Sequence, residues 1–452
     1  MKIIIAGYGK MGAALVRQLS AEGDDLTLID SDLKILESSQ DRHDVMVVKG
    51  NCASMEVLIQ AGVKEADLLI AMAGADEMNL LCCMTAHGLN PKIHTIARVC
   101  NPEYTEQTYA MRDVFGLSMA VNPERQAAAE MERLLKYPGF LKRDTFTKGR
   151  VEIVELRIDG KSKLCNVALN DMYDIVKCKI LVCAVLRNGR AVAPNGQFVL
   201  CEGDRVFVTA STNTLASLLK NLGIITHKVK SVISCGGGRV SYYLAKQLEN
   251  SGIDVKIIER DAVRCTQLAS LLPKAVVIHG DASSQSMLEG EGIFDCDALL
   301  TMTGLDELNM IISLYGASCG VRQIITKLGH IDNADILGDL NLGSVISPKE
   351  LCCNTIVQYV RAMKNQTGAA LTVHTIADGQ AEAMEFLVDG KTRHCGEPLK
   401  SIKLKKGVLV VSIFKGSRLE IPNGDSCFHV GNTMYIVTDR EKGIYQLNDI
   451  FE

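Results

Sequence analysis

The sequence predicts an α/β protein with two doubly wound parallel-sheet domains, each followed by a small α+β domain. Three observations predict this class. From residue 2 to about residue 120, short apolar strands alternate with helical patterns, which is typical of a parallel sheet with helices on both faces. The texture then changes to short strands separated by Asn-Gly and Gly-Asp turns. Finally, this whole succession occurs twice in 452 residues.

The elements of the first half follow from local patterns. The first is an apolar strand at Lys2–Ala6, followed by an amphipathic helix at Gly12–Ala21 and a strand at Asp25–Ile29. The strand–helix alternation continues to about Ala120. Pro123 then opens an amphipathic helix, because proline suits the first turn, and Pro138-Gly139 is expected to end it. This helix is a candidate crossover or dimerisation arm.

The segment after that helix has the period of antiparallel strands. VEIVELRID at 151–159 alternates with a period near two, and further strands are expected in ILVCAVLRNG, AVAPNGQFVL and RVFVTAS, with one or two helices. The second half repeats this plan. Its helix is predicted over 347–363, and its strands in 381–390, 408–416 and 433–439.

The duplication is visible in matched landmarks at a nearly constant offset. Glu259 lies 229 residues beyond Asp30, and both end a strand. The glycine-rich segments that begin at Gly7 and Gly236 keep the same distance. This offset is too long for a solenoid repeat and indicates duplicated domains. We therefore expect a first nucleotide-binding domain at 1–122, a helix with a small domain at 123–226, a second nucleotide-binding domain at 227–346 and a second helix with a small domain at 347–452.

Composition narrows the class of protein. Lys plus Arg number 49 and Asp plus Glu 53, a net charge of −4, which argues against a general nucleic-acid binder. No apolar run approaches the roughly 18 residues that cross a bilayer, and the N-terminus enters a glycine motif instead of a signal peptide. The expected location is therefore the cytoplasm, with any membrane role supplied by a partner.

The sixteen cysteines do not form a recognisable metal or disulfide framework. No C-x-x-C pair occurs, and none of the nine histidines stands at metal-ligand spacing from cysteine. We expect buried, reduced thiols that fill space, and no metal site.

The first glycine motif carries the strongest chemical signal. It reads Gly7, Tyr8, Gly9, Lys10, Met11, Gly12, follows a strand and opens a helix. The first glycine permits a tight turn, the second lets backbone N–H groups approach a pyrophosphate, and the third allows close helix packing. Asp30 ends the second strand, where it would accept hydrogen bonds from the adenosine ribose and repel a 2′-phosphate. The pattern predicts NAD(H) rather than NADP(H).

The second glycine motif departs from this pattern at one position. It reads Gly236, Gly237, Gly238, Arg239, Val240, Ser241, and Glu259 takes the place of the acid. Serine replaces the third glycine but is small enough for close packing. Two interpretations stay open: a site for some adenine nucleotide, or a degenerate copy with a structural role.

Small residues and cations mark the ends of later strands. Ala73 with Gly74, and Thr303 with Gly304, follow the fourth strand of each copy and would let a ligand pass over the backbone. Arg98 and Lys327 end the next strand and are candidate phosphate contacts. A simple turn and a solvated charge are the alternatives. Helix N-capping explains the aspartates at 76 and 306 without a ligand.

The sequence lacks the groups that would consume a bound nucleotide. The histidines are scattered, and no P-loop, G-x-S-x-G or H-E-x-x-H motif occurs. A dehydrogenase needs a proton-transfer group and a substrate pocket. We therefore expect a protein that senses the nucleotide and is not an enzyme, with an NAD-dependent oxidoreductase as the rival hypothesis.

Two segments carry a resemblance to a known family. IIIAGYGKMGAALVRQL with TLID resembles a TrkA-N (RCK/KTN) domain, and LRNGRAVAPNGQFVLCEGDRVFV resembles a TrkA-C domain. With its double arrangement, the chain resembles the TrkA family of regulatory subunits of Trk-type potassium uptake systems. The resemblance implies binding of NAD(H), with ATP or ADP as a possible second ligand. It also implies a four-chain ring docked on the inner face of the membrane to an integral-membrane Trk pore subunit of the TrkH/TrkG type.

The resemblance also implies which residues hold the nucleotide. They are Gly7, Tyr8, Gly9, Lys10, Met11, Gly12, Asp30, Ala73, Gly74 and Arg98 in the first copy, and Gly236, Gly237, Gly238, Arg239, Val240, Glu259, Thr303, Gly304 and Lys327 in the second. A regulator of another cation channel or antiporter is the remaining alternative.

Overall fold

The computed structural model describes residues 1–136, 142–146, 151–223, 228–249, 251–329, 340–364, 370–377, 380–416, 418–439, 444 and 446–452. The predicted helix stop at Pro138-Gly139 and the predicted boundary at 226/227 lie outside these residues. The chain forms two compact units, one of residues 1–127 with 347–359 and one of residues 128–346 with 360–452.

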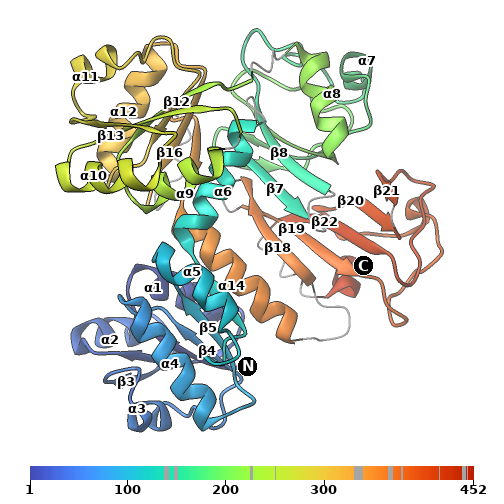
Figure 1. Cartoon of the computed structure of the whole chain (residues 1–452). Coiled ribbons are helices and arrows are strands. Elements are labelled where there is room, and N and C mark those ends of the chain that lie inside the picture. Colours follow the sequence, from blue (N-terminus) through green and yellow to red (C-terminus); the bar gives the residue numbers. More distant parts are fainter. Residues whose placement is uncertain are drawn as a thin grey trace. The chain divides into compact units, whose positions relative to one another are not determined.

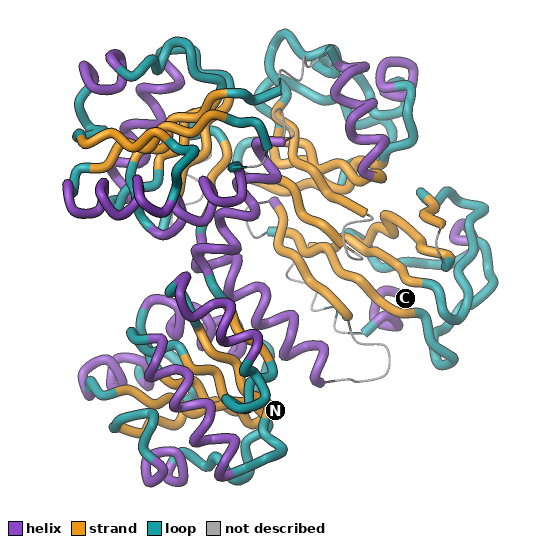
Figure 2. The backbone as a smooth tube through the Cα atoms, in the orientation of Figure 1, coloured by secondary structure: helices purple, strands orange, loops and turns teal. Residues whose placement is uncertain are grey.

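The first parallel sheet has six strands with the order β3-β2-β1-β4-β5-β6, and helices cover its two faces (Figures 1 and 2). Its strands are β1 (Lys2–Ala6), β2 (Asp25–Asp30), β3 (Met46–Lys49), β4 (Leu68–Ala71), β5 (His94–Arg98) and β6 (Met119–Val121). Its helices are α1 (Lys10–Ala21), α2 (Leu33–Gln40), α3 (Met55–Gln60), α4 (Asp76–Leu89) and α5 (Pro102–Ala110).

The central strands of this sheet, such as β1 and β4, are buried on both faces, which explains their nearly continuous apolar sequences. Ile3, Ile4 and Ile5 of β1 are at most 1% exposed. On one face Ile4 and Leu69 share a core cluster with residues of α3 and α4, including Leu58 and Cys83. This packing fixes the strand ends and therefore the loops that follow them.

The second parallel sheet repeats the first, with the order β14-β13-β12-β15-β16-β17. Its strands are β12 (Ser231–Cys235), β13 (Asp254–Glu259), β14 (Val276–His279), β15 (Ala298–Thr301), β16 (Gln323–Lys327) and β17 (Ser344–Ile346). Its helices include α9 (Arg239–Leu248), α10 (Ala262–Leu271), α11 (Gln285–Gly290) and α12 (Asp306–Ser318). The matching order confirms the predicted fold class and shows the duplication in three dimensions.

The two small domains also share one topology. The first has the order β10-β9-β11-β8-β7 and the second the order β18-β19-β22-β20-β21. The first contains β7 (Lys142–Phe146), β8 (Val151–Arg157), β9 (Leu181–Arg187), β10 (Arg190–Val192), β11 (Arg205–Ser211), α7 (Met172–Val176) and α8 (Thr212–Leu222). The second contains β18 (Ala370–Ile376), β19 (Ala381–Leu387), β20 (Val408–Lys415), β21 (Arg418–Glu420), β22 (Thr433–Asp439) and the 3₁₀ turns η3 (Leu399–Ser401) and η5 (Leu447–Ile450).

Three local expectations in these domains needed correction. The edge strands β7, β18 and β21 were not predicted; the β7 sequence KRDTF lacks apolar alternation, and this strand pairs with β8 at the end of the sheet. The segment AVAPNGQFVL contributes only β10 and an isolated bridge between Val199 and Ala168. Helix α1 begins at Lys10, two residues before the predicted start.

Two long helices, α6 (Pro123–Lys136) and α14 (Pro348–Lys364), follow the last strand of each parallel sheet. Within the first compact unit, the Tyr359 hydroxyl of α14 lies 2.8 Å from Nδ1 of His94 in β5. Within the second, Nε2 of Gln323 in β16 donates to the Leu134 carbonyl of α6 at 2.8 Å. Each long helix therefore packs on the parallel sheet of the other half of the sequence.

An ion pair between Arg187, 33% exposed, and a buried carboxylate stabilises the first small domain. Asp204 is 1% exposed and accepts from Nε and Nη2 of Arg187, both at 2.7 Å, and from the Cys201 N–H at 2.8 Å. In the second small domain Lys415 and Asn432 occupy the equivalent positions. Asn432 keeps the turn contact, accepting from the His429 N–H at 2.9 Å, but Lys415 pairs with Glu420 instead. The second small domain therefore does without the buried pair.

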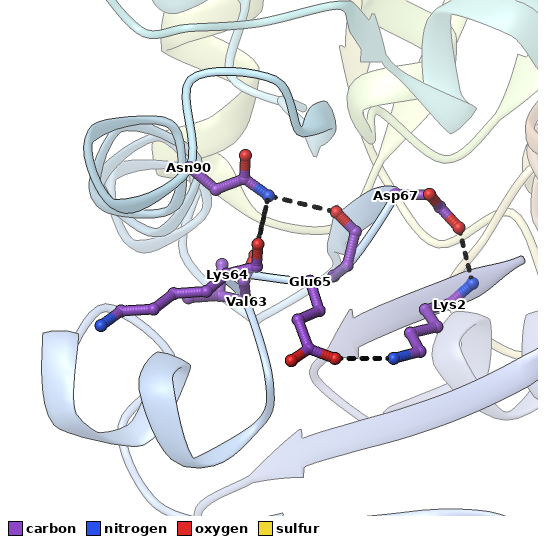
Figure 3. A network of polar contacts seen from close by, with 7 residues as sticks. Lys2, Val63, Lys64, Glu65, Asp67 and Asn90 are labelled. Carbon is purple, nitrogen blue, oxygen red and sulfur yellow. Dashed lines mark hydrogen bonds and ion pairs between the residues drawn. The ribbon is translucent and has the colours of Figure 1, made fainter.

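The amino-terminal edge of the first sheet is closed by polar contacts within the chain (Figure 3). Asp67 accepts from the Lys2 N–H at 2.8 Å, and Glu65 pairs with the Lys2 ammonium at 2.8 Å. Nδ2 of Asn90 donates to the carbonyls of Val63 and Ala66. These groups therefore satisfy one another at this edge of the sheet.

None of the sixteen cysteines forms a disulfide bond, and half of them are buried. Burial raises the pKa of Cys83 and of Cys235 to about 12, so these thiols are neutral at physiological pH. Among the described residues, no three His, Cys, Asp or Glu side chains are placed to hold a metal ion. No helix in the described ranges has the length and apolar character to span a bilayer.

Candidate nucleotide-binding sites

The first glycine loop lies between the carboxyl ends of β1 and β4, where the strand order of the sheet reverses. Gly7 has φ +100°, and a Cβ there would lie 2.8 Å from the Ala73 nitrogen. A Cβ on Gly12 would lie 2.1 Å from the Gly7 carbonyl oxygen. Both glycines are therefore required by the protein's own packing.

Gly9 differs from Gly7 and Gly12 because no contact within the protein requires a glycine at this position. A Cβ at Gly9 would meet no atom within 4 Å, and the same holds for Gly74 beyond β4. Gly9 is the N-cap of α1 and provides no side-chain cap to the first N–H groups of that helix. An exposed glycine at an uncapped helix N-terminus suits a ligand phosphate that approaches the backbone closely.

Asp30 holds the glycine loop in place. Its carboxylate accepts from the Tyr8 N–H at 2.7 Å and from the Asp32 N–H at 3.0 Å. Each carboxylate oxygen has a second lone pair, so both can still accept from a ribose hydroxyl. The residue thus combines the predicted ligand contact with a loop-fastening role that sequence reasoning did not assign.

Asn79 joins the ends of β4 and β5, and the sequence analysis missed it. The side chain is fully buried, accepts from the Ala73 N–H at 2.7 Å and donates to the carbonyls of Ala73 and Arg98 at 3.1 and 2.9 Å. Asn309 makes the equivalent bonds to Thr303 and Lys327. An asparagine at the same place in both halves of the sequence was the signal that could have identified this residue.

Arg98 lies at the rim of the first site and is not merely a solvated strand end. Its Nη2 donates to the carbonyls of Ala73 and Gly74 at 2.9 and 3.3 Å. Lys327 of the second copy is held at a different carbonyl: its Nζ donates at 3.2 Å to Met302, one residue before the equivalent of Ala73. Both cations are therefore tied to the backbone that follows the fourth strand.

The second glycine loop has the same construction. Gly236 has φ +101°, and a Cβ there would lie 2.9 Å from the Met302 carbonyl oxygen. Glu259 accepts from the Gly237 N–H at 2.6 Å and from the Asp261 N–H at 2.8 Å. Gly238 and Gly304 are open, with no atom within 4 Å of an added Cβ.

Ser241 shows how the second loop tolerates the missing glycine. Its hydroxyl donates to the Gly236 carbonyl and lies 3.2 Å from Oγ of Ser234. The side chain is therefore satisfied inside the loop and leaves the ligand side unchanged.

The aspartates that begin α4 and α12 are not N-caps, contrary to the sequence-based explanation. The N-cap positions are Ala75 and Leu305, which provide no side-chain bond. Asp76 instead accepts from the N–H groups of Cys100 and Asn101 at 2.9 and 2.7 Å, and Asp306 accepts from Gly329 at 2.9 Å. These carboxylates hold the chain as it leaves the fifth strand.

Two sets of predicted residues therefore come together, each at the carboxyl edge of one sheet. The first site comprises the loop Gly7–Gly12, Asp30, Ala73, Gly74 and Arg98; the second comprises the loop Gly236–Ser241, Glu259, Thr303, Gly304 and Lys327. Lys10 and Arg239 are exposed, Tyr8 and Met11 are half-buried, and Val240 is only 6% exposed, so Val240 can offer a ligand little but its backbone. Open glycines, a helix N-terminus and a carboxylate are the chemistry that a nucleotide requires.

The class of protein follows from these two sites: a tandem of nucleotide-binding folds, each joined to a small α+β domain. The TrkA-N domain model matches residues 3–123 and 232–348, which together are more than half of the chain, and the TrkA-C domain model matches residues 153–223. The chain belongs to the TrkA family.

Curated relatives match along the whole chain. The Trk system potassium uptake protein TrkA of Haemophilus influenzae is 29% identical over 460 residues, covering 100% of this chain and 99% of that protein. The Trk system potassium uptake protein TrkA homolog of Archaeoglobus fulgidus is 31% identical over 452 residues, covering 100% of both.

Solved structures show the same fold. The crystal structure of the GsuK RCK domain superposes with a TM-score of 0.63 at 17% identity, covering 97% of this chain and 92% of that chain. The GsuK channel bound to NAD superposes with a TM-score of 0.62 at 17% identity, covering 97% of this chain and 77% of that chain. At this identity the likeness concerns the fold.

Proposed function

We propose that this chain is the nucleotide-binding regulatory subunit of a Trk-type potassium uptake system. The observation that carries the proposal is the pair of open-glycine sites in one chain, each connected to a long helix. In the first copy Arg98 pairs in register with Val121 of β6, and α6 begins two residues later. The names of the curated relatives, which are potassium uptake proteins, support the choice of system.

The first site is proposed to bind NAD(H), and ATP or ADP is compatible with the same chemistry. Asp30 would accept from the ribose, the open space over Gly9 would admit a phosphate, and Arg98 would leave the Ala73 carbonyl to pair with a second phosphate. The second site would use Glu259, Gly238 and Lys327 in the same roles. A bound dinucleotide would supply only its binding energy, with no chemical conversion.

Regulation would be mechanical. A nucleotide at the carboxyl edge would bias the arrangement of the nucleotide-binding domains, and a ring of such domains fixed to a pore would transmit this bias to the gate. The ligand must bind the open and closed arrangements with different affinities, because equal affinities shift no equilibrium. The proposed location is the cytoplasmic face of the membrane, docked to a TrkH/TrkG-type pore subunit.

Self-association, which the proposed four-chain ring requires, is supported by apolar side chains that recur on one helix face in both copies. On α4 Leu81 and Met84 are 45% and 41% exposed, and on α12 the equivalent Ile311 and Leu314 are 63% and 37% exposed. Large apolar residues at equivalent exposed positions of duplicated domains favour contact with further copies of the same domain. The proposed occupant of these faces is another copy of this chain.

The double variant Leu81→Glu/Ile311→Glu is therefore expected to reduce the mass of the assembly from four chains to a smaller species at micromolar concentration. A buried, unpaired carboxylate opposes association strongly. Light scattering coupled to gel filtration measures the mass. Lys64→Glu, an exposed turn position, is the control and should keep the four-chain mass; an unchanged mass in the double variant would contradict the proposed interface.

The function itself is tested by potassium flux into proteoliposomes that contain the Trk pore subunit with this protein. Flux should change when NADH or ATP is added and should stay constant when the pore subunit is alone. Flux that ignores every nucleotide would rule out the gating role. Conversion of NAD(H) with a panel of small metabolites would favour the rival oxidoreductase.

A further inference from the structure

The two sites differ on the side of the loop that faces the adenosine ribose. In the first site Asp30 is followed by Ser31 and Asp32, and the first turn of α2 contains Ile35, which is 37% exposed. Burial raises the pKa of the Tyr8 phenol, and the positive charge of Arg42 partly offsets this rise. No side-chain bond to the loop comes from α2 among the described contacts.

The second site has arginine at two of the corresponding positions. Arg260 follows Glu259, and Arg264 is the equivalent of Ile35 in α10. Nε of Arg264 donates to the Gly237 carbonyl at 2.8 Å, and Nη1 approaches Oε1 of Gln267 at 3.3 Å. The backbone N–H of Arg264 is held at 2.9 Å by the N-cap Asp261. The guanidinium is thus fixed against the glycine loop.

The loop itself has been adapted to receive this arginine. Tyr8 of the first loop is replaced by Gly237, where a Cβ would lie 2.5 Å from Cδ1 of Leu268 and 3.1 Å from Glu259. A side chain at this position would displace the end of Leu268, and in the second site Arg264 lies against the loop here. The two differences between the copies, glycine in place of Tyr8 and arginine in place of Ile35, therefore occur at positions that contact each other in the second site.

The ribose acids do not account for a difference in ligand, because Asp30 and Glu259 accept the same pair of backbone bonds. Arg260 is partly committed, since it adds to the hydrogen bonds from Ser283 that lower the pKa of Asp281. Arg264 has no carboxylate partner among the residues that the structure describes. Its remaining N–H groups form a planar fork that suits phosphate.

We propose that the second site binds an adenine nucleotide with a phosphate on its adenosine ribose, as in NADP(H), whereas the first site binds one without it. This inference rests on the proposed function, in which both loops bind nucleotides. Glu259 would keep the unmodified ribose hydroxyl, and Arg264 would offset the charge that otherwise repels the added phosphate. One chain would then bind two different nucleotides, one at each site.

Nucleotide binding at one site is measured in the full-length protein after a substitution has blocked the other site. Gly9→Glu places a carboxylate over the first loop, and Gly238→Glu does so over the second. In calorimetric titrations the Gly9→Glu protein should bind NADP⁺ at least about tenfold more tightly than NAD⁺, and the Gly238→Glu protein should show the reverse order. Adenosine 2′,5′-bisphosphate tests whether the ribose phosphate, without the nicotinamide half, is sufficient.

An exchange of the equivalent residues tests the role of Arg264. Arg264→Ile in the Gly9→Glu protein should weaken NADP⁺ about tenfold and leave NAD⁺ nearly unchanged, while Ile35→Arg in the Gly238→Glu protein should strengthen NADP⁺. Equal losses for both nucleotides in the Arg264→Ile protein, or a Gly9→Glu protein that prefers NAD⁺, would overturn the inference and leave the proposed function standing. Absence of nucleotide binding in the unmodified protein would overturn both.

Discussion

Replacing Gly9 with glutamate is expected to abolish nucleotide binding at the first site and to leave the fold intact. Gly9 has φ −70° and ψ −169°, which any residue adopts, and an added Cβ meets no atom within 4 Å. The new carboxylate would occupy the space of the ligand phosphate and repel it at the N-terminus of α1. NAD⁺ affinity should fall at least about 100-fold, equivalent to roughly 2.7 kcal/mol.

The measurement is a calorimetric titration with NAD⁺ of two proteins that both carry Gly238→Glu, one with and one without Gly9→Glu. Gly290→Glu is the matched control, because Gly290 at the end of α11 also has no atom within 4 Å of an added Cβ. Retained affinity in the Gly9→Glu protein would show that the ligand does not cross this loop.

By contrast, Gly12→Val should unfold the domain, since its Cβ would lie 2.1 Å from the Gly7 oxygen.

Replacing Arg187 with methionine is expected to destabilise the first small domain by about 3 kcal/mol. Asp204 is 1% exposed and would lose both guanidinium bonds, keeping only its turn contact with the Cys201 N–H. A buried carboxylate without its cation is costly because water cannot replace the lost partner. Hydrogen–deuterium exchange in β8, β9 and β11 measures the loss locally, which matters in a chain of several domains.

The second small domain contains the control for this prediction. Lys415, 35% exposed, takes the place of Arg187, 33% exposed, but its partner Glu420 is 32% exposed whereas Asp204 is 1% exposed. Lys415→Met should therefore cost less than about 1 kcal/mol, as is usual for solvated pairs. Similar losses of protection in the two domains would contradict the view that Arg187 and Asp204 form a specific buried pair.

Local patterns predicted the regular elements wherever burial dictates the residue type. Strands such as β1 and β12 are buried on both faces and so must be continuously apolar, which makes them visible in the sequence. The edge strand β7 was missed because it is ordered by pairing with one neighbour and its sequence, KRDTF, has no apolar alternation. The edge strand β18 was missed although it contributes Ala370 and Ile376 to the core.

The candidate sites were predictable to different degrees. The glycines are visible because only glycine fits a positive φ or a close backbone approach, as at Gly7 and Gly12. Asn79 and Arg264 act through contacts with residues that are distant in the sequence, namely Arg98 and Gly237. Asp76 was misread as a cap, because an aspartate at a helix start can also serve a neighbouring strand end.

The sequence by itself determined the duplication, the fold class and the position of both glycine loops, because these depend on periodicity and on residues with special backbone freedom. Only the tertiary structure decided which glycines are open to a ligand, how Asn79 and Asn309 fasten the strand ends, and that Arg264 lies on the second loop. The physical reason is that these properties depend on the distance between atoms that folding brings together, and residue order does not encode that distance locally. The four sheets of the chain can thus be recognised from its sequence, whereas the difference between its two sites cannot.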